Sequence, residues 1–271
     1  MAAAIPPIPN FTVRDAMVRC GASDTIIFDG RSVAQRLAGD IFLDDFATCM
    51  DKTFDEVNSD LKTYSELTVA QGQIRLLPGI KNNIRAFIQW TRDERRLGRN
   101  PARMQFPVGE AAMLMRRYKT HQKFVEQSKT LSEASKPEKF TKETKWLDWK
   151  QTFLNYLRNI PGRDGVPLKY VCRDHDQPNP IPHDDFLDDY VAMAQLNGEA
   201  FTIDSRTVHT LITNFIAGND TAEAKIQSNE HLKNGRMDFR SLCDHYEGVG
   251  ILAIDITKAE ATLRNLHYTG E

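Results

Sequence analysis

The sequence has no apolar run near the roughly 20 residues that span a bilayer, so no membrane-spanning helix is expected. Its beginning, MAAAIPPIPNF, lacks a basic stretch followed by a long apolar one, which excludes a secretory signal. The three prolines of this stretch oppose both helix formation and sheet pairing. We therefore predict a flexible lead-in over residues 1–12 and a cytoplasmic protein with no membrane partner.

The four cysteines stand singly, at Cys20, Cys49, Cys172 and Cys243, so neither a disulfide framework nor a zinc module is indicated. The phosphate-binding patterns GxxxxGK[ST] and GxGxxG, the HExxH metal pattern and a serine nucleophile elbow are absent. Cys243 and His245 are two residues apart, and on a helix such side chains point in different directions. We predict no enzyme activity, no cofactor, no metal and no small-molecule substrate.

Hydrophobic residues recur at helical spacing through most of the chain, and strand signals are confined to residues 24–28 and 166–171. These patterns predict an all-α, multi-helix fold. At the helix starts, Asp204 or Ser205 can cap one helix and Asp220 with Glu223 resembles a capping box. The expected helices cover residues 80–97, 108–135, 146–160, 204–216, a short segment from 220, 235–247 and 252–266.

Composition divides the chain further. Residues 136–145 are charged, contain one proline and have no aliphatic residue beyond alanine, which is typical of a linker. The predicted order is a lead-in, a small N-terminal helical unit, a basic helical segment, a hinge and a C-terminal helical domain. Their boundaries are 1–12, 13–75, 76–135, 136–145 and 146–271.

The stretch RDHDQPNPIPHDDFLDDY, residues 173–190, combines six aspartates with two histidines. A calcium loop needs alternating acidic ligands and a glycine at its sharp turn, and no glycine is present. His175 and His183 are eight residues apart across prolines. We interpret the stretch as an extended surface connector whose aspartates begin the next helix, where negative charge suits the helix dipole. A metal site is the alternative.

One basic segment lies in an otherwise acidic chain. Residues 81–123 hold eleven Lys or Arg against three acids, although the whole chain has a net charge of -2. Clustered cations neutralise phosphates, and a nearby aromatic ring stacks on unpaired bases, so RNA is a candidate partner. A solvated helix face is the alternative reading. The candidate nucleic-acid-binding residues are Trp90, Arg92, Arg95, Arg96, Arg99, Arg103, Arg116, Arg117 and Lys119.

Several dispersed motifs carry a resemblance to a known family. KWLDWKQTFLNYLRNIPGRDGVPLKYVCR, LNGEAFTIDSRTVHTLITNFI, NGRMDFRSLCDHYEGVG and ATLRNLHYTGE resemble the Gag polyprotein of copia-type LTR retrotransposons, in particular the Gag-like proteins of algal elements. The upstream GQIRLLPGIKNNIRAFIQWTRD is similar to the N-terminal extension of that narrower group. The residues expected to be structural in the motifs are Trp146, Trp149, Phe153, Gly162, Gly165, Pro167, Gly235, Arg236, His245, Tyr246 and Gly248.

The resemblance implies a non-enzymatic structural protein, because copia-type Gag supplies a helical capsid whose copies assemble around element RNA. The implied partners are further copies of the same chain and RNA. A typical Gag carries a CCHC zinc knuckle, which this sequence lacks, so RNA is expected as an electrostatic partner of the basic segment. The pattern also stops where a second helical lobe would follow, which suggests a fragment or a truncated copy. A helical adaptor, with residues 13–75 as an interaction module, is the alternative.

Overall fold

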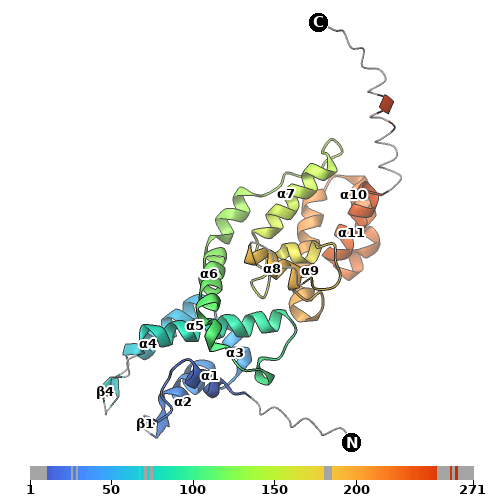
Figure 1. Cartoon of the computed structure of the whole chain (residues 1–271). Helices are drawn as coiled ribbons and strands as arrows, with labels where there is room; N and C mark the ends of the chain where they lie inside the picture. Colours follow the sequence, from blue (N-terminus) through green and yellow to red (C-terminus); the bar gives the residue numbers. More distant parts are fainter. Residues whose placement is uncertain are drawn as a thin grey trace, which may run out of the picture. The chain divides into compact units, whose positions relative to one another are not determined.

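The computed structural model describes residues 11–25, 27–28, 30–66, 68–69, 72–73, 76–179, 185–248, 257 and 260–261. Within these residues the fold is all-α, as predicted, and its few strands are two residues long (Figure 1). The chain divides into two compact units. Unit 1 comprises residues 1–126, 183–187 and 193–195, and unit 2 comprises residues 127–182, 188–192 and 196–271. None of the described helices is both long enough and apolar enough to cross a bilayer.

Unit 1 is built from short helices around one long one. Its elements are α1 (Val13–Arg19), β1 (Ile27–Phe28), β2 (Arg31–Ser32), α2 (Val33–Arg36), a π-helical turn (Leu37–Ile41), α3 (Phe46–Asp51), α4 (Phe54–Glu66), β3 (Thr68–Val69), β4 (Gly72–Gln73), α5 (Pro78–Arg96) and two 3-10 turns (Pro101–Arg103 and Val108–Glu110). The strands pair as two antiparallel hairpins, β1 with β2 and β3 with β4. The strand signal at residues 24–28 therefore yields only the two residues of β1.

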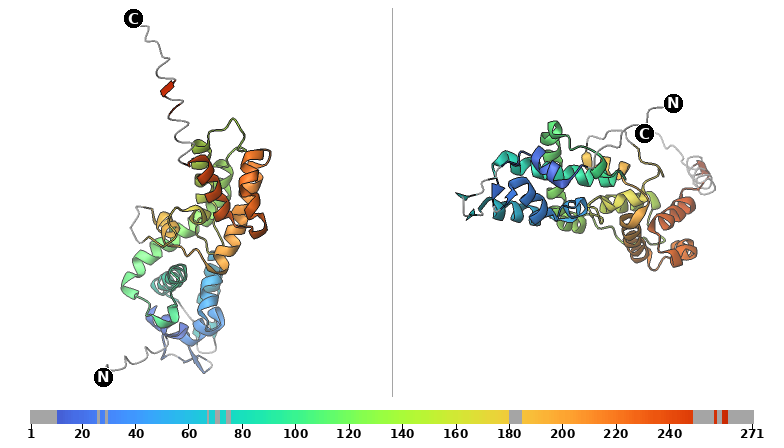
Figure 2. Two further views of the ribbon diagram at one scale, coloured as in Figure 1. Left: turned by 90° about the vertical axis from the view of Figure 1, so that its right-hand side faces the viewer. Right: turned by 90° about the horizontal axis from the view of Figure 1, so that it is seen from below.

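Helix α5 is the centre of unit 1, and the left view of Figure 2 looks nearly along its axis. Its residues Ile84, Phe87 and Ile88 are fully buried, and burial extends around the whole helix in its second half. Pro78 occupies the first turn, where a missing N–H costs nothing, and Gly98 follows the helix with a φ of 70°. The helix predicted for residues 80–97 is thus confirmed.

The folded chain begins earlier than predicted. Phe11 is buried, and the Thr12 side chain caps α1 in a capping box with Asp15. These two residues belong to unit 1 rather than to a lead-in, while residues 1–10 of the predicted lead-in lie outside the described residues.

Helix α6 (Ala111–Ala134) confirms the helix predicted for residues 108–135, and the boundary between the two units falls within it. The predicted hinge, residues 136–145, is irregular but fastened to unit 2. Phe140 is buried and its N–H donates to the Phe215 carbonyl at 2.8 Å. The indole N–H of Trp149 donates to the Glu138 carbonyl at 3.0 Å. These bonds make the segment a packed part of unit 2.

Unit 2 contains α7 (Trp146–Arg158), α9 (Gly198–Ile216), α10 (Asp220–Ile226), α11 (Gly235–Tyr246), most of α8 (Phe186–Met193) and two 3-10 segments (Leu168–Cys172 and Gln227–Leu232). The aromatic stripe of α7 forms its core. The Trp149 and Phe153 rings stack at 4.9 Å, and the Trp146 ring stacks on Tyr246 of α11 at 5.0 Å. The helix predicted over residues 146–160 is confirmed in α7.

Three local predictions for unit 2 were wrong. Helix α9 begins at Gly198, so Asp204 and Ser205 lie buried in mid-helix and cap nothing. The N-cap of α10 is Asn219, whose side chain accepts the Ala222 N–H at 3.2 Å. Of residues 166–171, read as a weak strand, only Pro167 pairs, in an isolated antiparallel bridge with Pro161, and a 3-10 segment (Leu168–Cys172) follows it. The helix predicted over residues 252–266 lies almost wholly outside the described residues.

Candidate nucleic-acid interface

The structure separates the nine predicted nucleic-acid-binding residues into buried and exposed ones. Trp90 is buried, with its ring 5.8–6.3 Å from those of Phe11, Phe87 and Phe106. It is a core residue of unit 1 and presents no face to an unpaired base. The prediction that Trp90 stacks on RNA therefore does not fit its position.

Arg92 and Arg95 fasten α5 to α3. The Arg92 guanidinium lies 4.6 Å from the ring centre of Phe54 and donates to the carbonyls of Met50 and Lys52. Arg95 forms an ion pair with Asp51 at 2.8 Å. Cations at a helix C-terminus satisfy its last carbonyls and suit its dipole, so these arginines stabilise the end of α3.

Arg96 and Arg117 surround a buried carboxylate. Asp93 Oδ1 accepts from Gln89 Nε2 at 2.8 Å and from Arg96 Nη1 at 2.9 Å, and Oδ2 accepts from Arg117 Nη1 at 3.2 Å. Asp93, Gln89 and Arg96 are all buried. Removing one partner of a buried ion pair typically costs about 3–5 kcal/mol, because a charge is left uncompensated. Arg96 and Arg117 are thus part of the internal structure of unit 1.

Arg99 follows α5 and is half exposed, but it too has an acidic partner. Its Nε lies 2.6 Å from Glu94 Oε2. Burial raises the pKa of the Glu94 carboxyl, and the neighbouring Arg99 opposes that rise. The basic run of α5 is therefore mostly neutralised by its own acids and by α3.

Three exposed cations lie together on one face of α6. Arg116 and Lys119 are exposed, and so is Lys123, which was not predicted as a site residue. Spacings of three and four place these three side chains on one helical face. Buried residues mark the opposite face: Leu114, Tyr118, His121 and Phe124. No described carboxylate forms an ion pair with the three cations.

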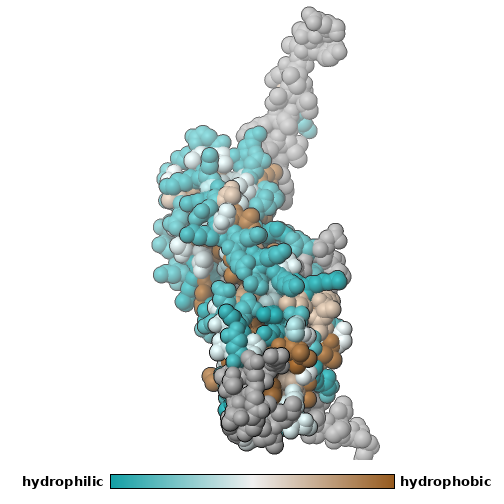
Figure 3. Space-filling model, turned by 90° about the vertical axis from the view of Figure 1, so that its left-hand side faces the viewer, coloured by the Kyte–Doolittle hydropathy of each residue, from teal (hydrophilic) through white to brown (hydrophobic). Residues whose placement is uncertain are grey.

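We call Arg116, Lys119 and Lys123 the α6 stripe. Arg103, also exposed, lies in the 3-10 turn before α6. Figure 3 shows one face of the molecule, on which hydrophilic residues predominate. The exposure of Lys123 could have been predicted from the sequence, because the apolar positions within residues 114–124 define the buried face of the helix and hence the cations that face solvent. The predicted interface thus contracts from nine residues on α5, α6 and the segment between them to a short stripe on α6.

The eleven motif residues expected to be structural all lie in unit 2, where most of them are packing residues. An added Cβ at Gly162 would lie 2.2 Å from the Asp204 carboxylate, and one at Gly235 would lie 2.5 Å from the His209 backbone nitrogen. Gly235 therefore lies directly against the α9 backbone, where a Cβ has no room, whereas a Cβ at Gly162 would displace the Asp204 carboxylate. Gly165 has a φ of 70°, which favours glycine in a turn. Other motif residues are buried or half-buried: Trp146, Trp149, Phe153, Pro167, His245, Tyr246 and Gly248.

Arg236, another motif residue, holds the acidic connector in place. It is buried, and its Nη1 donates to the carbonyls of Val171 at 2.8 Å and Arg173 at 2.7 Å. Its Nη2 and the exposed Arg240 both donate to Asp176 Oδ1, which lowers the pKa of that carboxyl. The first part of the connector is therefore bound by arginines.

The described residues contain no group of three or more His, Cys, Asp or Glu that could hold a metal ion. Residues 180–184 of the connector, with His183, are outside the described part. The Asp185 carboxylate lies at the start of α8, where its Oδ1 accepts the Leu187 N–H at 2.9 Å. That contact is the one expected of an acid at a helix N-terminus.

Two buried acids in unit 2 have unusual surroundings. Burial raises the pKa of Asp204 to about 6. Two hydrogen bonds to its carboxylate oppose this rise: the Arg163 N–H donates at 2.7 Å and the Tyr170 hydroxyl at 2.9 Å. Burial also raises the pKa of Asp238, which His209 Nδ1 contacts at 2.7 Å. These acids join α9 to the segment after α7 and to α11.

Neither acid belongs to an exposed nucleophilic site. Ser205, one turn before His209, is buried and its hydroxyl donates to Asn234 Oδ1 at 3.1 Å. Burial raises the pKa of the Cys243 thiol to about 12, so it is protonated at neutral pH. The contacts of Asp204 and Asp238 are those of residues that hold helices together in the tertiary structure.

Comparison with known proteins adds no relative: no family model matches the chain, and no curated protein or solved structure matches it significantly. The function therefore has to be argued from the residues themselves.

Proposed function

We propose that this protein is a non-enzymatic, self-associating structural protein of the Gag type, the capsid-like protein of a copia-type retrotransposon, with RNA as an electrostatic partner. The observation that carries the proposal is that the eleven motif residues expected to be structural all lie in unit 2, where they pack or form its turns. Trp146 and Phe153 form its core, Gly235 permits close helix approach, and Arg236 ties the connector to α11.

Residues of this kind stabilise the tertiary structure of unit 2. Catalytic motifs instead bring titratable and nucleophilic side chains together in a cleft. Many copies of one stable shape assemble through repeated contacts, which is the requirement for a shell. The motif residues of unit 2 fit that requirement.

Self-association is tested by light scattering on the full chain over a wide concentration range, with and without RNA. A mass that rises with concentration above the 30.9 kDa of one chain is expected, with RNA enhancing the rise. A chain that stays at one-copy mass in both conditions would contradict the capsid proposal and favour the helical adaptor.

The α6 stripe is the proposed RNA contact. Each phosphate contact with a single strand contributes about 0.7 to the slope of log affinity against log salt. Replacing Arg116, Lys119 and Lys123 by glutamate should therefore reduce the magnitude of that slope by about 2 and weaken binding.

The matched control changes three exposed lysines elsewhere, Lys62, Lys139 and Lys225, to glutamate, giving the same change in net charge. Filter binding to a single-stranded RNA at several salt concentrations measures both variants. Equal losses in the two variants would show that only net charge matters and that α6 is not the contact.

A further inference from the structure

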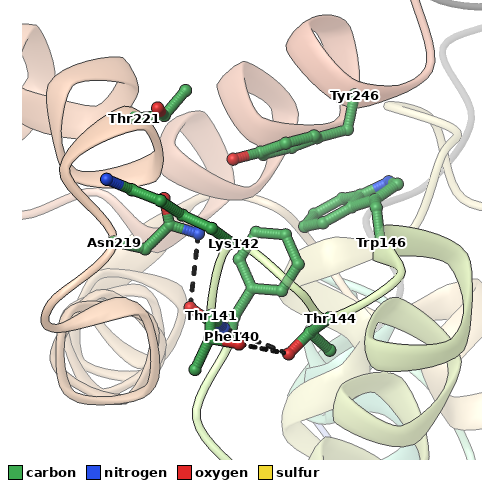
Figure 4. Close-up of a pocket in the computed structure, with 8 residues that line it drawn as sticks. All are labelled: Phe140, Thr141, Lys142, Thr144, Trp146, Asn219, Thr221 and Tyr246. Carbon is green, nitrogen blue, oxygen red and sulfur yellow. Dashed lines mark hydrogen bonds between the residues drawn. The ribbon is translucent and has the colours of Figure 1, made fainter.

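A half-open pocket of about 250 Å³ lies in unit 2, at the junction of the segment before α7, the N-terminus of α10 and the C-terminus of α11 (Figure 4). Its volume is below the roughly 300–1,000 Å³ that encloses a drug-sized ligand. It therefore suits one or two residues of a peptide. It is lined by Phe140, Thr141, Lys142, Thr144, Trp146, Asn219, Thr221 and Tyr246.

Aromatic rings form its apolar walls. The Phe140 ring meets the Tyr246 ring at 88° with centroids 5.2 Å apart, and Trp146 stacks behind Tyr246 at 5.0 Å. Phe140 and Trp146 are buried by the core, so their positions are fixed. Figure 4 shows these three side chains near one another: Phe140 from the segment before α7, Trp146 from the start of α7 and Tyr246 from the end of α11. Rigid aromatic walls at such angles form the grooves in which proline-rich peptides dock.

The rim carries little net charge. Lys142 reaches along it and forms an exposed ion pair with Asp220 at 3.3 Å. Threonine hydroxyls make up much of the rest: Thr141 and Thr144 bond each other at 3.0 Å, and Thr221 is exposed. A phosphate would require cations without a paired acid. Hydroxyls beside aromatic faces suit an uncharged ligand whose backbone carbonyls accept hydrogen bonds.

The chain itself contains a segment of this chemistry. Residues 5–9 read Ile-Pro-Pro-Ile-Pro, and residues 1–10 contain no charged side chain. Prolines cannot donate to a helix or sheet and favour the extended polyproline II conformation, which binds at low entropic cost. The segment lies directly before Phe11, where unit 1 begins, and outside the described residues.

We propose that the pocket of Phe140, Trp146 and Tyr246 receives one or two residues of a proline-rich extended segment, and that this segment is Ile5–Pro9 of a second copy of this chain. The inference rests on the proposed self-association. Each copy then contributes one segment and one pocket, so the contact joins two different surfaces of the chain. Such a contact supplies one of the repeated links that assembly requires.

The first test measures binding of an acetylated, labelled peptide of residues 3–11 to the full chain by fluorescence anisotropy. The chain carries Pro6, Pro7 and Pro9 changed to alanine, so that its own segment does not compete. Saturable binding is expected, and a peptide with the same three alanines should bind at least tenfold more weakly. No difference between the two peptides would overturn the proposal.

Substitutions locate the site. Thr221→Trp fills the pocket from its exposed rim and leaves the aromatic core intact, so at least a tenfold loss of peptide affinity is expected. Thr207→Trp, at an exposed position of α9 outside the pocket, is the matched control and should bind as the parent does. If Thr221→Trp weakens binding of an oligonucleotide but not of the peptide, the pocket is a base site and the proposal is wrong.

Light scattering then separates this inference from the proposed function. The triple alanine variant and Thr221→Trp should both assemble less than the wild type at equal concentration. If the wild type assembles and both variants match it, the pocket is not an assembly contact, although self-association stands. If the wild type stays at one-copy mass while the peptide binds, a second copy is excluded as the occupant and self-association fails with it.

Discussion

Replacing Arg236 by alanine should lower the free energy of unfolding of unit 2 by about 3 kcal/mol. The side chain is buried and donates to the carbonyls of Val171 and Arg173. A buried acceptor left without a donor costs about 1–3 kcal/mol, and the Val171 carbonyl is the more buried of the two. The bond to Asp176 adds less than about 1 kcal/mol, because that carboxylate is 65% exposed.

Arg240→Ala is the matched control. It removes an arginine from the same helix and the same carboxylate, but its side chain is 45% exposed, so a loss below about 1 kcal/mol is expected. Arg236→Lys should fall between the two, since one ammonium cannot reach three acceptors as a planar guanidinium does. The assay is hydrogen exchange by mass spectrometry on peptides from α9 and α11, which reports unit 2 separately from unit 1. Equal protection in Arg236→Ala and Arg240→Ala would refute the idea that the buried arginine holds the connector.

Two further predictions concern the contacts of α9. The folded-state pKa of Asp204, about 6 against an ordinary value of about 3.9, favours the neutral carboxyl, so its stabilising contribution is present below about pH 4 and is lost as the pH rises through 6. Denaturant melts at pH 4 and pH 7 should show the wild type losing about 2–3 kcal/mol relative to Asp204→Asn, and parallel curves would contradict it. Gly235→Ala places a Cβ 2.5 Å and 2.6 Å from backbone atoms of His209 and Ser205, which should cost about 1–3 kcal/mol in the same melts. Gly109→Ala, with no atom within 4 Å of its added Cβ, should change stability little, and equal effects of the two would exclude close packing as the cause.

Helical periodicity in the sequence predicted the long helices well. The apolar stripe from Trp146 to Ile160 corresponds to α7, and the repeat from Ile80 corresponds to α5. Each stripe is a local property, because residues three and four apart share a face whatever they pack against. The all-α class followed from the same property.

Local preference misplaced the start of α9. Asp204 and Ser205 are types that favour helix N-caps, but here they use their oxygens for tertiary bonds to Tyr170 and Asn234. A partner distant in sequence leaves no local pattern. The N-cap residue is Asn197, also a favoured type, although its side chain makes no capping bond; Asp204 and Ser205 were competing candidates of the same kind.

Only part of the candidate nucleic-acid interface could be predicted from the sequence, again because some contacts depend on the tertiary fold. Counting cations along residues 81–123 found a basic segment but could not tell which arginines turn inward. Asp93 meets Arg96 as an i,i+3 pair within α5, which the spacing alone indicates, whereas Asp51, the partner of Arg95, belongs to α3 and is positioned by the tertiary fold. The α6 stripe was accessible in principle, because the buried positions of that helix fix its exposed face.

The inward-facing arginines of α5 affect how binding data on this chain are to be interpreted. Charge reversal across a basic stretch is a common way to assign nucleic-acid contacts. Here Arg92→Glu would remove donors from the end of α3, and Arg96→Glu would place two carboxylates together inside unit 1. A loss of RNA affinity in either variant would report unfolding, so only substitutions paired with a melting curve can distinguish a contact from a scaffold.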